Sequence, residues 1–179
     1  MPPADIKQFR NMLRIALQMG GFSPKKLEPK MPLAWTLPAD EVVPVFFPHE
    51  IRRPWGFRLS GSLGIELPAL TAWLQARYAR EARGIFRHSF TTYHIANDPE
   101  INDFAAIFGE EIALNSWVER PKQRTTKLPT TVDALCETYR AKPDALGLFA
   151  WEISTPAWDW LLQWHADPDN APPVPQSLF

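Results

Sequence analysis

The histidines of the chain are the first side chains that could act as metal ligands or general bases. His88 and His94 are six residues apart, which separates them by about 20 Å in a strand and by about 120° around a helix axis. Neither geometry lets the two rings share one ion, so we expect no metal site. His49-Glu50 lacks the second histidine of the H-E-x-x-H zinc motif. His49, His88 and His94 are the candidate bases if the protein is an enzyme.

The single cysteine and the Ser-Gly motif of the chain are interpreted as structural. Cys136 follows Leu135 and lies four residues after Val132, on the apolar face of a predicted helix. A nucleophilic thiol needs exposure and a basic neighbour instead. The run 60–64 lacks the first glycine of the G-x-S-x-G nucleophile motif, and we expect a bulge or turn with positive φ there. The residues therefore favour a binding protein over an enzyme, with no cofactor.

Acidic side chains gather in one part of a chain that has 19 Lys and Arg against 20 Asp and Glu. The stretch 88–119 contains acids but neither Lys nor Arg. An acidic surface of this kind suits a basic protein partner, because complementary charge steers association. The candidate partner-binding acids are Asp98, Glu100, Asp103, Glu110 and Glu111.

Two basic clusters provide an alternative, a patch that contacts phosphate groups. The arginines of the first cluster fall within an arc of about 120° if a helix over 68–83 continues past them. The second cluster lies in a predicted polar loop, 120–127. The members are Arg77, Arg80, Arg83, Arg87, Arg120, Lys122, Arg124 and Lys127. Because Glu81 interrupts the first cluster and the net charge is -1, the pattern disfavours nucleic acid as the partner.

The 8 tryptophans are the most unusual feature of the composition. Trp73 lies on an apolar helical face, which predicts a core position. In the last predicted helix, Trp158 lies on one side while Trp160 and Trp164 lie on the other. A helix that is apolar all round is either inserted in the core or partly presented to a partner. Since tryptophan is enriched at interface hot spots, Trp160 and Trp164 are candidate partner contacts, with core insertion as the alternative.

The elements that would position these side chains are strand-rich stretches followed by helix-rich ones. Periodicity and capping residues predict helices over 5–19, 68–83 and 98–108, from 130 or 131 onward, and over 155–166. Strands are expected over 33–37, 42–47, 55–65, 90–95 and 146–153. Without regular βαβ alternation, this order predicts an α+β fold with a largely antiparallel sheet of about 4–5 short strands and about 4–5 helices. We expect a single domain over 1–167 and a proline-rich tail over 168–179.

The first 80 or so residues combine a predicted first helix with Phe9 and Leu13, Gly21-Phe22 and Lys25-Lys26, and Trp35 in a predicted strand before Gly64-Ile65. In this layout they resemble small bacterial α+β proteins of uncharacterised-domain type, some of which are immunity proteins of polymorphic toxins. It implies binding of a cognate toxin and no reaction. It carries over no catalytic residue, because no site motif is matched.

These observations together point to a cytoplasmic protein-binding module. The sequence has no run of about 18 apolar residues, no secretory apolar region at the N-terminus and one cysteine, so we expect no membrane association and a reducing compartment. The main hypothesis is an immunity or antitoxin protein that neutralises a cognate toxin or effector by covering its active site. The alternatives are a small hydrolase with a histidine–carboxylate site and a nucleic-acid-associated factor that uses the basic clusters.

Overall fold

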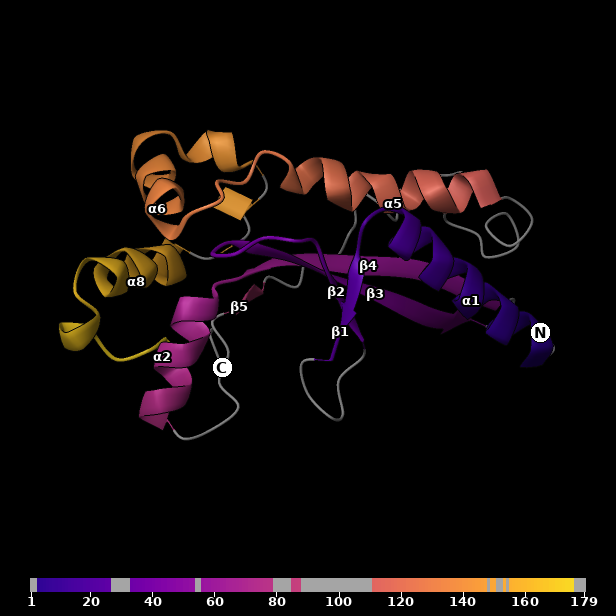
Figure 1. The fold of residues 1–179 in the computed structure, drawn as a ribbon, viewed down its shortest axis with the longest axis horizontal. Helices are drawn as coiled ribbons and strands as arrows, with labels where there is room; N and C mark the ends of the chain where they lie inside the picture. Colours follow the sequence, from indigo (N-terminus) through magenta and orange to yellow (C-terminus); the bar gives the residue numbers. More distant parts are fainter. Residues whose placement is uncertain are drawn as a thin grey trace. The chain divides into compact units, whose positions relative to one another are not determined.

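The structure is a computed structural model that describes residues 3–26, 33–53, 56–78, 85–87, 111–147, 149–150, 153 and 155–175. Figure 1 shows the helices and strands of these ranges. The α-helices are α1 (Pro3–Met19), α2 (Pro68–Tyr78), α5 (Glu111–Thr125), α6 (Val132–Ala141) and α8 (Thr155–Ala166), and the 3-10 helices are η1 (Pro143–Leu146) and η2 (Pro168–Asn170). The strands are β1 (Ser23–Lys25), β2 (Ala34–Thr36), β3 (Val43–Arg53), β4 (Gly56–Glu66) and β5 (Ile85–Arg87).

The five strands form one sheet in the order β1-β2-β3-β4-β5. β1 pairs antiparallel with β2, with Pro24 opposite Trp35, and β4 pairs antiparallel with β5, with Ile65 opposite Phe86. Only two residues separate β3 from β4 in the chain, a connection that antiparallel strands alone permit. The predicted α+β fold with a largely antiparallel sheet is therefore confirmed. The strand expected over 90–95 and the helix expected over 98–108 lie outside the described residues.

The chain divides into two compact units, each with its own packed side chains. Unit 1 comprises Met1–Pro38, Phe46–Leu63 and Ser89–Thr125, and unit 2 comprises Ala39–Val45, Gly64–His88 and Thr126–Phe179. The long strands β3 and β4 contribute residues to both units. The boundary between a domain and a tail at residue 167 stays a prediction.

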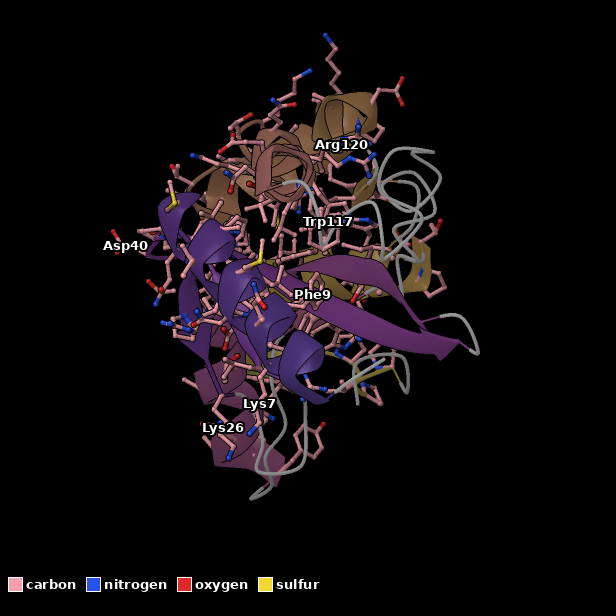
Figure 2. All side chains as sticks on the ribbon, turned by 90° about the vertical axis from the view of Figure 1, so that its right-hand side faces the viewer. Lys7, Phe9, Lys26, Asp40, Trp117 and Arg120 are labelled. Atoms are coloured by element: carbon pink, nitrogen blue, oxygen red, sulfur yellow. The ribbon has the colours of Figure 1, made fainter. Side chains whose placement is uncertain are left out.

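In unit 1, helix α1 packs through the apolar face that the sequence predicts. Phe9, Leu13 and Leu17 are buried, and Figure 2 shows Phe9 on the inner side of the helix. The helix ends at a glycine pair, where Gly21 adopts a positive φ of 89°, a conformation that costs glycine little. A Cβ on Gly20 would lie 2.8 Å from the Val118 side chain, so the pair also lets α1 approach α5 closely.

The aromatic core of unit 1 is centred on Phe46 of β3. Its ring lies 6.0 Å from that of Phe22 and 5.3 Å from that of Trp117 on α5, and Figure 2 shows Trp117 beneath its helix. A Cβ on Gly61 of β4 would meet the Phe46 ring at 2.5 Å. The positive-φ turn expected over 60–64 is wrong at this residue: Gly61 lies in a strand without positive φ, and glycine is required there because an aromatic ring occupies the place of its side chain.

Helix α5 replaces residues 120–125 of the polar loop that the sequence predicts over 120–127, and residues 126–127 form a turn after it. Its buried residues are Leu114, Trp117, Val118, Pro121 and Thr125, which follow a helical spacing along one face. A proline inside a helix removes one backbone hydrogen bond. The burial of Trp117 and its neighbours outweighs that loss, so the basic cluster of 120–124 lies on a helix.

In unit 2, α6 and α8 form as expected and pack against each other. Thr131 is the N-cap of α6, and its hydroxyl accepts a hydrogen bond from the backbone N–H of Ala134. The strand expected over 146–153 is wrong, because residues 143–146 form η1 and residues 149–150 are helical. Pro143 begins the 3-10 turn and Gly147, with a φ of 58°, ends it. Leu146 and Phe149 are buried in helical turns. A short apolar run is compatible with either a buried strand or a buried helix, so the apolar residues of 146–153 could not distinguish the two.

Candidate protein-binding site

Three tryptophans of unit 2 form a cluster, here named the tryptophan platform: Trp73 of α2 with Trp160 and Trp164 of α8. The Trp73 ring lies 6.0 Å from that of Trp160 and 6.2 Å from that of Trp164, in both cases edge to face. Trp160 and Trp164 are four residues apart on one helix face and are stacked at 6.5 Å. Leu70 and Leu74 of α2 are fully buried. Trp73 between them is half-buried, so it is more exposed than the core position that the sequence predicts.

Arg77 completes one edge of the platform. It follows Trp73 by one helical turn, and its guanidinium carbon lies 4.5 Å from the centre of the Trp73 ring. A guanidinium over an indole face gains a cation–π attraction, of about 0.5–1 kcal/mol at an exposed site. Since the Arg77 side chain is 43% exposed, its donors can reach a group outside α2.

Residues 167–175, here named the C-terminal segment, cover this platform. The indole N–H of Trp73 donates to the carbonyl of Pro168 at 3.1 Å, and the indole N–H of Trp160 donates to the carbonyl of Pro172 at 2.9 Å. Arg77 donates to the carbonyls of Pro168 and Asp169 at 3.3 and 3.4 Å. In Figure 1 the chain leaves α8, turns through η2 and runs back toward α2.

A local turn sets the direction of the C-terminal segment. The Asp167 carboxylate accepts the side-chain amide of Asn170 at 2.8 Å and its backbone N–H at 3.4 Å. The side-chain hydrogen bond from Asn170 lowers the pKa of the Asp167 carboxyl. Asp167 is therefore ionised at neutral pH and stays an acceptor that holds the turn.

One polar atom of the platform is not used. The indole N–H of Trp164 is buried and has no hydrogen-bond partner among the described residues. A buried donor without an acceptor is costly, at about 1–3 kcal/mol. The platform thus retains one donor beyond the two that the C-terminal segment occupies.

Comparison with protein-family models, curated protein sequences and solved structures finds no match in any of the three. The geometry of the chain itself is therefore the basis for assigning the site. The resemblance to small immunity-type proteins stays a prediction.

The tryptophans expected to contact a partner are covered within unit 2. Trp160 and Trp164 are 3% and 5% exposed, so the side of α8 that could have been free packs on Trp73 and beneath the C-terminal segment. A partner that takes the indole N–H of Trp160 has to displace Pro172 of that segment. Trp158 is fully buried and stacks on Tyr139 at 4.4 Å, and burial raises the pKa of that tyrosine.

Of the candidate histidine bases, the structure describes His49 alone. Its ring nitrogen Nε2 lies 3.3 Å from the hydroxyl of Ser62 on the neighbouring strand, within unit 1. Ser62 is 4% exposed, whereas a serine nucleophile has to reach a substrate. We interpret the contact as a cross-strand hydrogen bond. His88 and His94 lie outside the described residues.

A histidine–carboxylate pair does exist, at a residue that the sequence did not single out. His165 Nε2, near the end of α8, lies 2.6 Å from Asp133 Oδ1 in the first turn of α6. The Asp133 side chain is 82% exposed and that of His165 is 28% exposed. The pair links two helices at the surface of unit 2, which supports a structural role.

The predicted charge clusters are described only in part. Asp98, Glu100, Asp103 and Glu110 lie outside the described residues, and Glu111 is the first residue of α5. Arg80 and Arg83 also lie outside them, whereas Arg87 lies on β5 instead of extending α2. Lys122 forms an ion pair with Glu119 at 3.6 Å. Of the first basic cluster, Arg77 therefore lies on a helix and Arg87 on a strand, so these two arginines do not share one helix face.

The described ranges contain no group of three or more His, Cys, Asp or Glu side chains that could hold a metal ion. None of their helices is long and apolar enough to cross a membrane. Cys136 is 1% exposed, and burial raises the pKa of its thiol from 9.0 to about 11. The predicted core position of this cysteine is confirmed.

Proposed function

We propose that this protein is a protein-binding module and that its contact region is the tryptophan platform with Arg77. The observation that supports the proposal is the half-buried Trp73 with the partly exposed guanidinium of Arg77 stacked over it. Tryptophan and arginine are the side chains most enriched at interface hot spots. The platform is also rigid, because buried leucines and stacked rings fix its geometry, so little entropy is lost on binding.

The partner class that we propose is a cognate toxin or effector, which the module neutralises in the cytoplasm by covering its active site. The support is the resemblance of the first 80 or so residues to immunity-type proteins, together with the acids of 98–111 as a complementary surface. At the tryptophan platform the partner would offer an acceptor-rich segment to Arg77.

The test uses the product of the gene that adjoins this one. Expressed together, the two proteins should form a stoichiometric complex on gel filtration, and the growth defect caused by the neighbouring product should disappear. Arg77→Glu should weaken the complex by about 10-fold or more, a change of about 1.4 kcal/mol.

The matched control is Arg14→Glu on α1 of unit 1, an exposed arginine that bonds only to Asn11 and Gln18 of its own helix in the described structure. It makes the same charge change and should leave the affinity unaltered. Equal losses in both variants would indicate a general charge effect and contradict the proposed contact region. So would an unchanged affinity in Arg77→Glu.

A further inference from the structure

We propose that the tryptophan platform recognises extended proline-rich segments and that the C-terminal segment is its resident ligand. This inference deepens the proposed function, since it names the partner chemistry at the same surface. The partner it implies is a protein that presents a run such as the Ala171-Pro172-Pro173-Val174-Pro175 of this chain.

The sequence of residues 171–175, the part of the C-terminal segment after η2, specifies an extended backbone. Proline fixes its own φ near -65°, and the residue before a proline is pushed out of the helical region. Every residue from 171 to 175 is a proline or precedes one. Ala171 accordingly has φ -58° and ψ 138°, close to the polyproline II values. The segment is thus largely ordered before it meets the platform, which reduces the entropy lost on docking.

The donors of the platform match the acceptors of such a backbone. A polyproline II segment has no internal hydrogen bonds, so its carbonyls are free to accept. Trp160 donates its indole N–H to the carbonyl of Pro172 in the extended run, at 2.9 Å. Trp73 donates to the carbonyl of Pro168, at 3.1 Å, in the 3-10 turn that leads into this run. Proline-rich segments dock into aromatic-lined grooves in several kinds of binding domain. The buried indole N–H of Trp164, without a partner among the described residues, is a further donor for a segment seated in another register.

The resident segment acts as an intramolecular competitor. It follows α8 directly, because η2 begins two residues after the helix ends. A ligand tethered this closely has an effective concentration in the millimolar range. A free proline-rich peptide of moderate affinity therefore binds the full chain weakly, and binding strengthens when the resident segment is weakened or removed.

The experiment measures the fluorescence anisotropy of a labelled peptide with the sequence of residues 167–175. The proteins are the full chain, the variant Pro172→Gly/Pro173→Gly, and a variant that ends at Ala166. Both variants should bind the peptide at least 10-fold more tightly than the full chain does. Trp160→Phe in the double-glycine background removes the indole donor, keeps an aromatic ring and should weaken binding about 3- to 10-fold. The control peptide has glycine in place of the prolines at positions 172, 173 and 175.

Three outcomes would overturn the inference. The first is the absence of peptide binding by the folded Pro172→Gly/Pro173→Gly variant. This variant is sufficient for the test even if the chain that ends at Ala166 fails to fold. The second is equal affinity for the glycine control peptide, since this would indicate a general apolar surface. The third is self-association of the shortened chain in place of peptide binding, which would make a second copy the occupant. Toxin neutralisation is measured separately, so the failure of either proposal leaves the other testable.

Discussion

Glu41 caps helix α6 from far away in the sequence: its Oε2 accepts a hydrogen bond from the backbone N–H of Val132 at 3.0 Å. Val132 is the first residue of α6, and the N–H groups of a first helical turn have no partner within the helix. The hydroxyl of Thr131 accepts from the N–H of Ala134 at 3.1 Å. Two donors of the same turn are therefore satisfied, one by the adjacent Thr131 and one by Glu41, which precedes β3.

Removing either cap should destabilise unit 2. We expect Glu41→Ala and Thr131→Ala each to lower the free energy of unfolding by about 1 kcal/mol, the usual loss for an N-cap. Glu41→Gln keeps an acceptor oxygen and should cost less than Glu41→Ala. Urea unfolding followed by circular dichroism measures all three. A free energy unchanged by Glu41→Ala would mean that the contact does not persist in solution.

Gly61 should tolerate no side chain while Phe46 is present. Gly61→Ala places a methyl group 2.5 Å from the Phe46 ring, and such overpacking costs about 1–3 kcal/mol. In a double-mutant cycle, Phe46→Leu should relieve part of this loss, which gives a favourable coupling energy. Gly147→Ala is the control, because a Cβ there meets nothing within 4 Å and the cost comes from a φ of 58°. Phe46→Leu should not relieve Gly147→Ala, and additivity in the Gly61 cycle would contradict the packing account.

Cys136 should make the protein sensitive to alkaline pH. Burial raises the pKa of its thiol from 9.0 to about 11, so the protonated form is favoured in the folded state. Its stabilising effect is fully present below about pH 9 and is lost as the pH rises toward 11. Between pH 8 and pH 10.5 the wild type should lose about 1–2 kcal/mol more unfolding free energy than Cys136→Ala. Parallel losses in the two proteins, measured by urea unfolding, would show that the thiol is not responsible.

The predicted acidic surface can be tested by charge reversal. Glu110→Lys/Glu111→Lys should slow association with a basic toxin about 10-fold and change dissociation little, because complementary charges act mainly on the encounter. Stopped-flow association at two salt concentrations measures both the rate and its salt dependence. An unaltered rate and salt dependence would exclude these acids from the interface.

Local sequence signals were sufficient for the capped helices. The face of Phe9 and Leu13, the Gly20-Gly21 pair and the Thr131 cap each act over a few residues, and α1 and α6 form as expected. Helix α5 was missed in its second half, because the polar, basic run of 120–127 indicated a loop, and residues 110–118 were ambiguous between helix and strand. If Pro121 is counted as an apolar residue, it continues the helical spacing of Leu114 and Trp117 along one face. Burial of this face in unit 1 stabilises the helix in spite of the proline.

The platform could not be predicted, because it depends on contacts between residues far apart in the sequence. Trp73 donates to a carbonyl 95 residues later, and no periodicity records such a pairing. Two local signals were present: a proline-rich run near the end of the chain and tryptophans four residues apart in the helix before it. The affinity of aromatic surfaces for polyproline backbone connects them.

The most direct test of the proposed binding function is the ¹H–¹⁵N spectrum of the indole N–H groups, recorded with and without the product of the adjoining gene, the partner that we propose. Single Trp→Phe variants assign the peaks. Binding at the platform should shift the indole peaks of Trp73 and Trp160, whose present acceptors are the carbonyls of Pro168 and Pro172. The indole peak of Trp117, buried in unit 1, should stay in place. Shifts confined to Trp117, with Trp73 and Trp160 unchanged in a saturated complex, would contradict the account.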